Sequence, residues 1–262
     1  MDIAIITGAS SGLGREFARH IANRYQQLDE IWLIARRRER LKALASELAS
    51  STHAAFRVVP LDLADSSNYG GLGELLADSK PVIRVLVNNA GYEREGLLRD
   101  MEPDDMLAMI DLNVKGMTMI NRICLPYMSR GSFEIVTGSV SAFAPMPWQA
   151  VYGASKAYVR SLVFAIREEE RRRGVNIMLL SPGNMDTEMN VRGSGGGKIG
   201  MLPYLNLART VERSLSLAER GCGEYAPVAF YKTYRLLAKL VPATLMARFT
   251  RLNSGGANGR GL

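Results

Sequence analysis

The chain has 262 residues, 47% of them hydrophobic, and carries a formal net charge of +7 at pH 7. This length and composition favour one large α/β domain, and the lack of any run of about 18 uncharged apolar residues argues against a membrane-spanning helix. Arginines cluster at residues 36–40 and 171–173 without interleaved aromatic residues or a known binding motif. We therefore expect no nucleic-acid partner.

Cysteine and histidine are both scarce in this chain. Cys124 and Cys222 are the only cysteines, too few for a disulfide framework or a zinc cluster. His20 and His53 are the only histidines, so a Ser-His-Asp hydrolase or a histidine-based metal site lacks parts, and we expect no metal. Because the chain enters a predicted strand at once, we also expect no export signal and a cytoplasmic location.

Short β-rich runs alternate with longer helical patterns along the chain. Strands are predicted at residues 3–6, 31–35, 56–61, 82–88, 133–137, 175–181 and 224–229. Helices are predicted at residues 12–26, 37–50, 67–79, 103–130, 151–173 and 206–220. Several strands are apolar almost throughout, as strands covered on both faces must be, and the crossover lengths suit parallel pairing. The pattern predicts a single α/β domain with a Rossmann-like, doubly wound parallel sheet of about seven strands and helices on both faces.

A glycine-rich turn follows the first predicted strand. Its glycines permit a tight turn and let backbone amides approach a pyrophosphate, which the N-terminus of the next helix stabilises. Such turns recur by chance, but this one lies between a predicted strand and a predicted helix, which indicates a dinucleotide site. The residues of the turn that we expect at the cofactor are Gly8, Ser10, Ser11, Gly12, Leu13 and Gly14.

The second predicted strand is followed by Arg36 and Arg37, where a residue specific for the ribose is expected. An NAD site usually has an acid there, whereas the first acid here is Glu39. A guanidinium can bind a 2′-phosphate through charge-assisted hydrogen bonds, so Arg36, helped by Arg37, indicates NADP(H). The alternative is an ordinary basic start of the next helix, because arginines continue to residue 40.

The loops after the third and fourth strands complete the expected crevice, since ligands bind at the carboxyl ends of the strands in such sheets. Asp62 and Leu63 close the third strand, where they can meet the adenine. Asn89, Ala90 and Gly91 close the fourth strand.

Tyr152 and Lys156 are four residues apart in the predicted helix 151–173, so their side chains share one face. A phenol has a pKa of about 10, which must fall by a few units before it exchanges protons near neutrality, and an adjacent ammonium favours the phenolate. We therefore expect Lys156 to lower the pKa of Tyr152. Ser139, at the end of the fifth strand, can hydrogen-bond the substrate oxygen. Asn113 falls inside the preceding predicted helix, where a polar residue often only caps or hydrates the helix.

Six sequence motifs, in order and at family spacing, resemble those of the short-chain dehydrogenase/reductase family over residues 2 to about 230. They are the TGASSGLG turn, the NNAG segment, Asn113, Ser139, the YGASK segment, and Pro182-Gly183 followed by Thr187. The resemblance implies an oxidoreductase that interconverts a ketone and a secondary alcohol, and the arginine after the second strand resembles the NADP(H)-preferring branch. Tyr152 would be the general acid for reduction or the base for oxidation. Ser139 would orient and polarise the substrate oxygen.

The resemblance assigns further roles at the nicotinamide end. Lys156 would lower the pKa of Tyr152 and hydrogen-bond the nicotinamide ribose. Asn113 would hold a water that links Lys156 to solvent. Pro182 and Gly183 would belong to the cofactor site, and Thr187 would contact the nicotinamide carboxamide. The resemblance also implies a homodimer or homotetramer.

Substrate choice is expected to depend on residues 92–97 and 140–150 and on a lid at about 184–205. Apolar side chains in these segments predict an adaptable pocket for a small hydrophobic carbonyl or alcohol, such as a hydroxysteroid, or they only pack the lid. These side chains are Phe143, Met146, Trp148, Met185, Met189, Met201 and Leu202. Reduction of acyl-chain carbonyls and a non-catalytic NADP(H)-binding sensor are the alternatives. The retained tyrosine and lysine favour an enzyme over a sensor.

Residues 1–229 are predicted to form the catalytic domain, and residues 230–262 a basic amphipathic extension with a disordered end. Beyond Glu224 the chain has six basic residues and no acidic one. One helical face there carries Phe230, Tyr234, Leu237 and Val241. Such a helix can rest on an anionic membrane, here through residues 230–251, but it more often packs on its own domain or on a neighbouring subunit.

Overall fold

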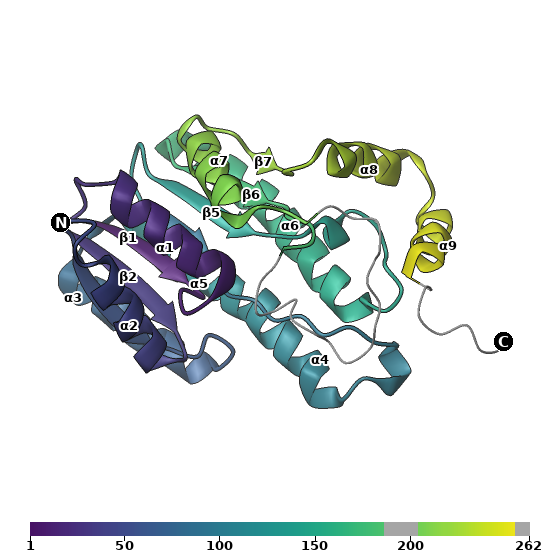
Figure 1. Ribbon diagram of the computed structural model, residues 1–262, viewed down its shortest axis with the longest axis horizontal. Coiled ribbons are helices and arrows are strands. Elements are labelled where there is room, and N and C mark those ends of the chain that lie inside the picture. Colours follow the sequence, from purple (N-terminus) through teal and green to yellow (C-terminus); the bar gives the residue numbers. More distant parts are fainter. Residues whose placement is uncertain (186–203, 255–262) are drawn as a thin grey trace.

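The computed structural model describes residues 1–185 and 204–254, with side chains described through residue 250. Within these residues, seven parallel strands form one sheet in the order β3-β2-β1-β4-β5-β6-β7 (Figure 1). Their bounds are β1 Asp2–Thr7, β2 Glu30–Ala35, β3 Ala55–Pro60, β4 Val82–Asn88, β5 Phe133–Thr137, β6 Asn176–Leu180 and β7 Glu224–Tyr225. The predicted doubly wound parallel sheet is confirmed. β7 is shorter than predicted, and pairs with β6 only through Glu224 and Tyr225.

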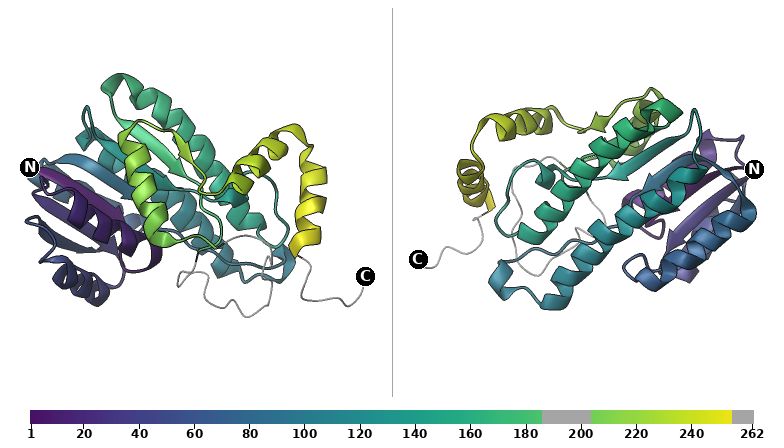
Figure 2. Two further views of the ribbon diagram at one scale, coloured as in Figure 1. Left: turned by 45° about the horizontal axis from the view of Figure 1, so that its top comes forward. Right: turned by 180° about the vertical axis from the view of Figure 1, so that it is seen from behind.

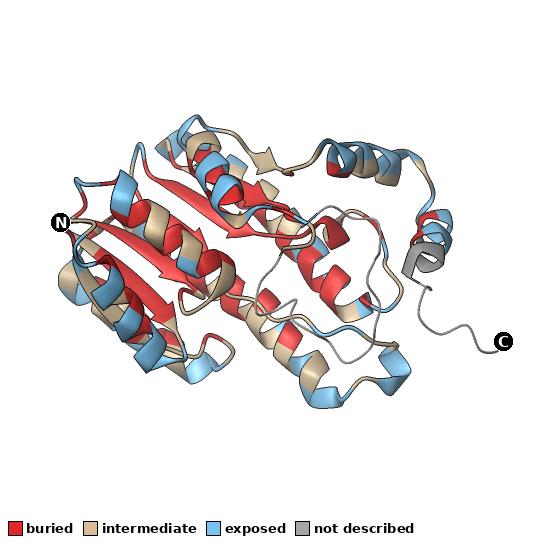
Figure 3. Cartoon of the chain, viewed as in Figure 1, coloured by how far each residue is buried: buried red, intermediate tan, exposed pale blue. Residues whose placement is uncertain are grey.

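Helices cover both faces of the sheet (Figure 2). One face carries α1 (Gly12–Arg24), α2 (Arg38–Leu48) and α7 (Leu207–Glu219). The other carries α3 (Tyr69–Ser79), α5 (Met117–Cys124) and α6 (Ala150–Glu170). Because side chains alternate along a strand, Ile3 and Ile5 of β1 enter one core while Ala4 and Ile6 enter the other. The central strands of the sheet are buried and are red in Figure 3, whereas β7 is half-buried and tan.

The helix predicted at residues 103–130 is present through Tyr127, but it is not a uniform α-helix. It consists of α4 (Pro103–Ile110), a π-helical segment (Asp111–Gly116) and α5. The wider π turn shifts the side chains that follow it and is frequent at functional sites. Gly116, the last residue of the π-helical segment, packs against the backbone of the loop between β3 and α3. An added Cβ at Gly116 would stand 2.6 Å from the carbonyl oxygen of Leu63 in that loop. Hydrophobic periodicity cannot show one extra residue in a turn.

Two helices follow the sheet, α8 (Ala229–Leu240) and α9 (Ala243–Ser254), at one end of the molecule (Figure 1). The face of α8 that packs on the domain differs from the predicted one. Tyr231 is 1% exposed, whereas Phe230 and Leu237 of the predicted apolar face are exposed. Within the described chain, no helix combines the length and apolarity needed to cross a bilayer.

Candidate active site

A cleft of about 410 Å³ opens at the carboxyl ends of the strands, where the strand order reverses between β1 and β4. It runs from the glycine turn and the arginines after β2 to α6 and the loop after β6. All the predicted site residues line it except Gly14, Asn113 and Thr187. Gly14 and Asn113 lie behind its wall, and Thr187 lies outside the described residues. One cleft therefore joins the predicted cofactor half to the predicted chemical half.

The glycine turn brings backbone amides into the cleft. Gly8 has a φ of 67°, a left-handed conformation that suits glycine. An added Cβ at Gly14 would stand 2.3 Å from the carbonyl oxygen of Gly8. Glycine at position 14 therefore allows the first turn of α1 to pack directly on the glycine turn. No side chain caps the N-terminus of α1, and its first turn has no acidic residue. The free N–H groups of this turn fit a pyrophosphate.

Two arginines stand where a 2′-phosphate is expected, but they differ in their contacts. The guanidinium of Arg37 donates to the hydroxyl oxygen of Ser11 at 2.8 Å and to that of Ser10 at 3.0 Å. Arg36 is largely exposed, and its guanidinium lies 3.9 Å from the carboxylate of Asp62. Sequence reasoning ranked Arg36 first, whereas the structure places Arg37 directly on the glycine turn. Both guanidinium groups and both hydroxyls suit an anionic phosphate.

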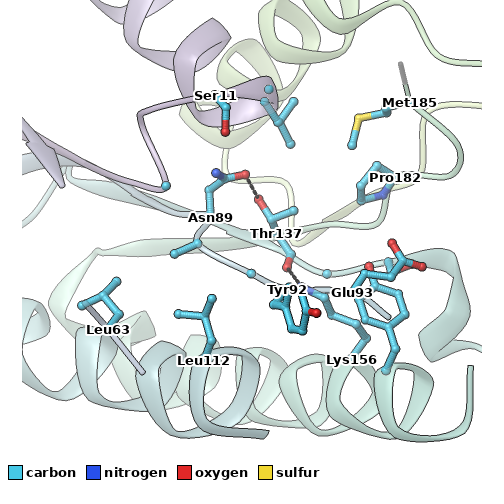
Figure 4. A pocket seen from close by; sticks show the side chains of 18 of the residues that line it. Ser11, Leu63, Asn89, Tyr92, Glu93, Leu112, Thr137, Lys156, Pro182 and Met185 are labelled. Atoms are coloured by element: carbon cyan, nitrogen blue, oxygen red, sulfur yellow. Dashed lines mark hydrogen bonds between the residues drawn. The ribbon is translucent and has the colours of Figure 1, made fainter. Parts of the chain in front are cut away.

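Two threonines hold together the strand ends at the cleft, and Figure 4 shows one of them, Thr137, beside Asn89. The hydroxyl oxygen of Thr7 accepts hydrogen bonds from the backbone N–H groups of Asn89 at 2.8 Å and Ala90 at 2.9 Å. The hydroxyl of Thr137 donates to the side-chain oxygen of Asn89 at 3.1 Å. The ends of β1, β4 and β5 are thereby tied to one another. Sequence analysis missed both threonines, although each ends a predicted strand.

Tyr152 and Lys156 project from α6 into the cleft, beside Ser139 at the end of β5. The ammonium of Lys156 donates to the carbonyl oxygen of Thr137 at 2.9 Å and lies 5.7 Å from the centroid of the Tyr152 ring (Figure 4). The hydroxyl oxygen of Ser139 accepts from the backbone N–H of Ser141 at 3.2 Å. The predicted juxtaposition of phenol, amine and hydroxyl is present.

The electrostatics of this group differ from the sequence expectation. Burial raises the pKa of Tyr152, with the charge of Glu93 adding to the effect and a hydrogen bond with Ser139 opposing it. Burial also lowers the pKa of Lys156 to about 8, against the opposing charge of Glu93. The expected lowering of the Tyr152 pKa was wrong for the protein alone, because loss of solvation outweighs any help from an amine that is itself desolvated. The phenol is therefore protonated near neutrality.

The π-helical segment buries Asn113 completely behind the loop that follows β4. Its side-chain oxygen accepts from the backbone N–H of Tyr92, and its amide donates to the carbonyl oxygen of Tyr92, both at 2.8 Å. An added Cβ at Gly91 would stand 3.2 Å from the Asn113 side-chain oxygen and 3.5 Å from the Lys156 ammonium. A side chain at this position would therefore press on Asn113 and touch Lys156, whereas glycine leaves the space beside them open. The water relay implied by the resemblance stays a prediction.

Two glutamates that sequence analysis did not single out line the chemical end of the cleft. The amide of Gln149 donates to the carboxylate of Glu93 at 3.1 Å and to that of Glu95 at 2.5 Å. Burial, together with the charge of Glu95, raises the pKa of Glu93 to about 7. The signal was present in the sequence, because both acids lie in the short segment that follows the NNAG motif. This wall of the cleft is acidic.

The predicted hydrophobic pocket is found only in part. Met146 and Met185 line the cleft. Phe143 packs instead against the ring of Tyr234, with centroids 6.1 Å apart, and Trp148 is an exposed residue outside the cleft lining. Three further members of the predicted set lie outside the described residues, namely Met189, Met201 and Leu202.

Known proteins share both the sequence and the fold of this chain. A family model described as short chain dehydrogenase matches residues 2–194. An uncharacterized oxidoreductase of Staphylococcus epidermidis is 32% identical over 216 residues, covering 82% of this chain and 90% of the relative. Sulfoacetaldehyde reductase 2 of Chromohalobacter salexigens is 34% identical over 199 residues, covering 74% and 77%. The alcohol dehydrogenase of Thermococcus sibiricus, solved with 5-hydroxy-NADP, superposes with a TM-score of 0.74 at 25% identity, covering 88% and 97%.

Proposed function

The chain belongs to the short-chain dehydrogenase family, and we propose that it is an NADP(H)-dependent oxidoreductase that interconverts a ketone and a secondary alcohol. The observation that carries the proposal is the single cleft that joins the glycine turn and Arg37 to Tyr152, Lys156 and Ser139. When bound, the reduced nicotinamide supplies a hydride to the carbonyl carbon.

The residues of this chain supply the proton and the orientation. Ser139 holds the carbonyl oxygen by a hydrogen bond, and the protonated phenol of Tyr152 donates its proton to that oxygen as it gains negative charge. Burial keeps the phenol of Tyr152 protonated at neutral pH, so the proton is in place for transfer. Lys156, anchored on the Thr137 carbonyl, keeps its ammonium beside the phenol and favours the phenolate that remains.

Replacement of Tyr152 by phenylalanine tests the proposal. We expect kcat for ketone reduction, followed as NADPH consumption, to fall by about 10² to 10⁴-fold, because a general acid contributes about that much. The matched control is Tyr158→Phe on the same helix, since Tyr158 is exposed and its hydroxyl contacts Thr118. Nucleotide binding with no turnover of any carbonyl by the wild-type protein would instead favour the sensor.

NADP(H) is favoured over NAD(H) by the side chains at the end of β2. Arg36 and Arg37 both line the cleft, and Arg37 already bonds two hydroxyls of the glycine turn. The solved alcohol dehydrogenase of Thermococcus sibiricus holds a derivative of NADP, which supports the same choice.

The charge of the cleft restricts the substrate. Glu93 and Glu95 stand at its chemical end, so we expect a neutral or cationic carbonyl compound to bind better than an anionic one. A sulfonated aldehyde of the kind named for the Chromohalobacter relative would be repelled. Met146 and Met185 support the apolar part of the predicted ketone, of which a hydroxysteroid is one candidate. A substrate panel of neutral, cationic and sulfonated carbonyl compounds decides among these.

We also propose a homodimer formed through α4 and α6. Leu107 and Ile110 of α4 and Tyr158 of α6 are large, exposed side chains, which supports an interface there. Both cysteines are free thiols, which supports a reducing compartment such as the cytoplasm. Light scattering of the purified chain, with Leu107→Ser as the variant, tests the dimer.

A further inference from the structure

Helix α8 exposes an apolar face to solvent. Residues three, four or seven apart lie on one side of a helix, and α8 has four large apolar side chains in this relation. They are Phe230 at 53% exposure, Leu236 at 58%, Leu237 at 48% and Leu240 at 74%. An apolar stripe this wide on one helix marks a surface that contacts something else.

The orientation of α8 is fixed by contacts on its opposite side. Tyr231 is buried against the loop after β6, so close that an added Cβ at Gly183 would overlap its hydroxyl. The guanidinium of Arg235 bonds the carboxylate of Glu224, which also receives Arg160 at 3.4 Å. Turning the apolar stripe inward would break both contacts. The stripe therefore faces outward in the folded domain.

Helix α9 adds a second exposed stripe to the same end of the molecule (Figure 3). Leu245 and Phe249, four residues apart, are exposed, whereas Met246 and Thr250 are buried. The hydroxyl of Thr250 lies 3.1 Å from the carbonyl oxygen of Pro145, so α9 contacts the loop that flanks the active site. The two helices thus form one arm with outward apolar stripes and inward anchors.

The charges of the arm are all positive. Lys232 and Lys239 lie beside the stripe of α8, and Arg248 lies on α9, all exposed. No acidic residue follows Glu224 in the chain, and Glu224 itself is bonded to two arginines. A second copy of this arm would offer only further cations to its lysines and arginine, with no acidic partner for them. An anionic lipid surface would meet both the cations and the apolar stripe.

We propose that the α8–α9 arm docks this protein on anionic phospholipid membranes. The apolar stripe enters the boundary between headgroups and acyl chains, and the lysines at its edge reach the phosphate and carboxylate groups. Because Thr250 and Tyr231 tie the arm to the loops at the active site, docking holds the cleft next to the bilayer surface.

Vesicle sedimentation with the full chain tests the proposal. We expect binding to vesicles of phosphatidylcholine with phosphatidylserine, weak binding to phosphatidylcholine alone, and loss of binding at high salt. The double variant Leu237→Ser/Leu240→Ser should reduce partitioning at least about tenfold, since burial of each leucine drives insertion. The double variant Lys232→Ala/Lys239→Ala should reduce it on anionic vesicles by about fivefold per charge.

Two controls make the result decisive. Leu98→Ser removes an exposed leucine that lies outside both the arm and the helices of the proposed dimer, and it should leave vesicle binding unchanged. Circular dichroism and NADPH binding in solution should be unchanged in the arm variants, which separates docking from folding and from the proposed activity. The proposal is overturned if the wild-type chain does not sediment with anionic vesicles. Normal vesicle binding by the Leu237→Ser/Leu240→Ser variant would also overturn it. The same holds if this variant binds vesicles normally and light scattering shows that it has lost a dimer, because the stripe would then be a protein–protein interface.

Discussion

Glu134 is a carboxylic acid near the start of β5, completely buried in the sheet. One oxygen accepts from the side-chain amide of Asn88 at 3.3 Å, and the other has no hydrogen-bond partner among the described residues. Burial raises the pKa of Glu134 from 4.5 to about 8. The folded protein therefore keeps the proton at neutral pH, whereas the unfolded chain releases it.

This difference makes stability depend on pH. The folded state binds more protons than the unfolded state between pH 4.5 and about 8, so the free energy of unfolding falls as pH rises through that window. Each pKa unit is worth about 1.4 kcal/mol, so retaining the proton at pH 7 costs roughly 3 kcal/mol. Glu134→Gln is neutral at every pH and can still accept from Asn88. We expect it to be up to about 3 kcal/mol more stable than the wild type at pH 7.

Urea unfolding followed by circular dichroism at pH 5, 7 and 8.5 measures the effect. The difference between wild type and Glu134→Gln should grow from near zero at the lowest pH to its largest value at the highest. The exposed Glu74 on α3 provides the matched control, because Glu74→Gln removes a carboxylate from solvent. A constant difference across this range, or a variant less stable than the wild type at pH 8.5, would show that the buried acid is not held protonated.

Three further predictions concern the cleft. Arg36→Ala and Arg37→Ala should each weaken NADPH binding by about 10 to 150-fold in fluorescence titrations, because each removes a charged hydrogen bond. NADH binding should change little. Equal losses of affinity for NADPH and NADH would contradict a 2′-phosphate site. Gly14→Ala should lower stability by about 1–3 kcal/mol and weaken nucleotide binding through its clash in the turn, whereas Gly73→Ala, with open space around it, should not. For a cationic amino ketone, KM should fall as pH rises through about 7 when Glu93 ionises, and Glu93→Gln should lose this dependence in steady-state assays.

The local sequence determined the sheet and most of the residues around the cleft. Strands covered on both faces are mostly apolar, and the turn requires its glycines because Gly8 and Gly12 have positive φ and Gly14 packs against Gly8. The same is true of Tyr152 and Lys156, whose spacing of four places them on one face of any helix. These features depend on residues that are close together in the sequence, and so they can be predicted without knowledge of the tertiary structure.

Tertiary structure decided the charges and the contacts between distant segments. The pKa of Tyr152 rises because the fold removes water from it, and Glu93 adds to the rise because the loop after β4 places it nearby. The outward face of α8 is set by Tyr231 beneath Gly183, almost fifty residues away in the sequence. Solvation and long-range packing depend on which segments meet in space, and the amphipathic pattern of one helix cannot specify its partner.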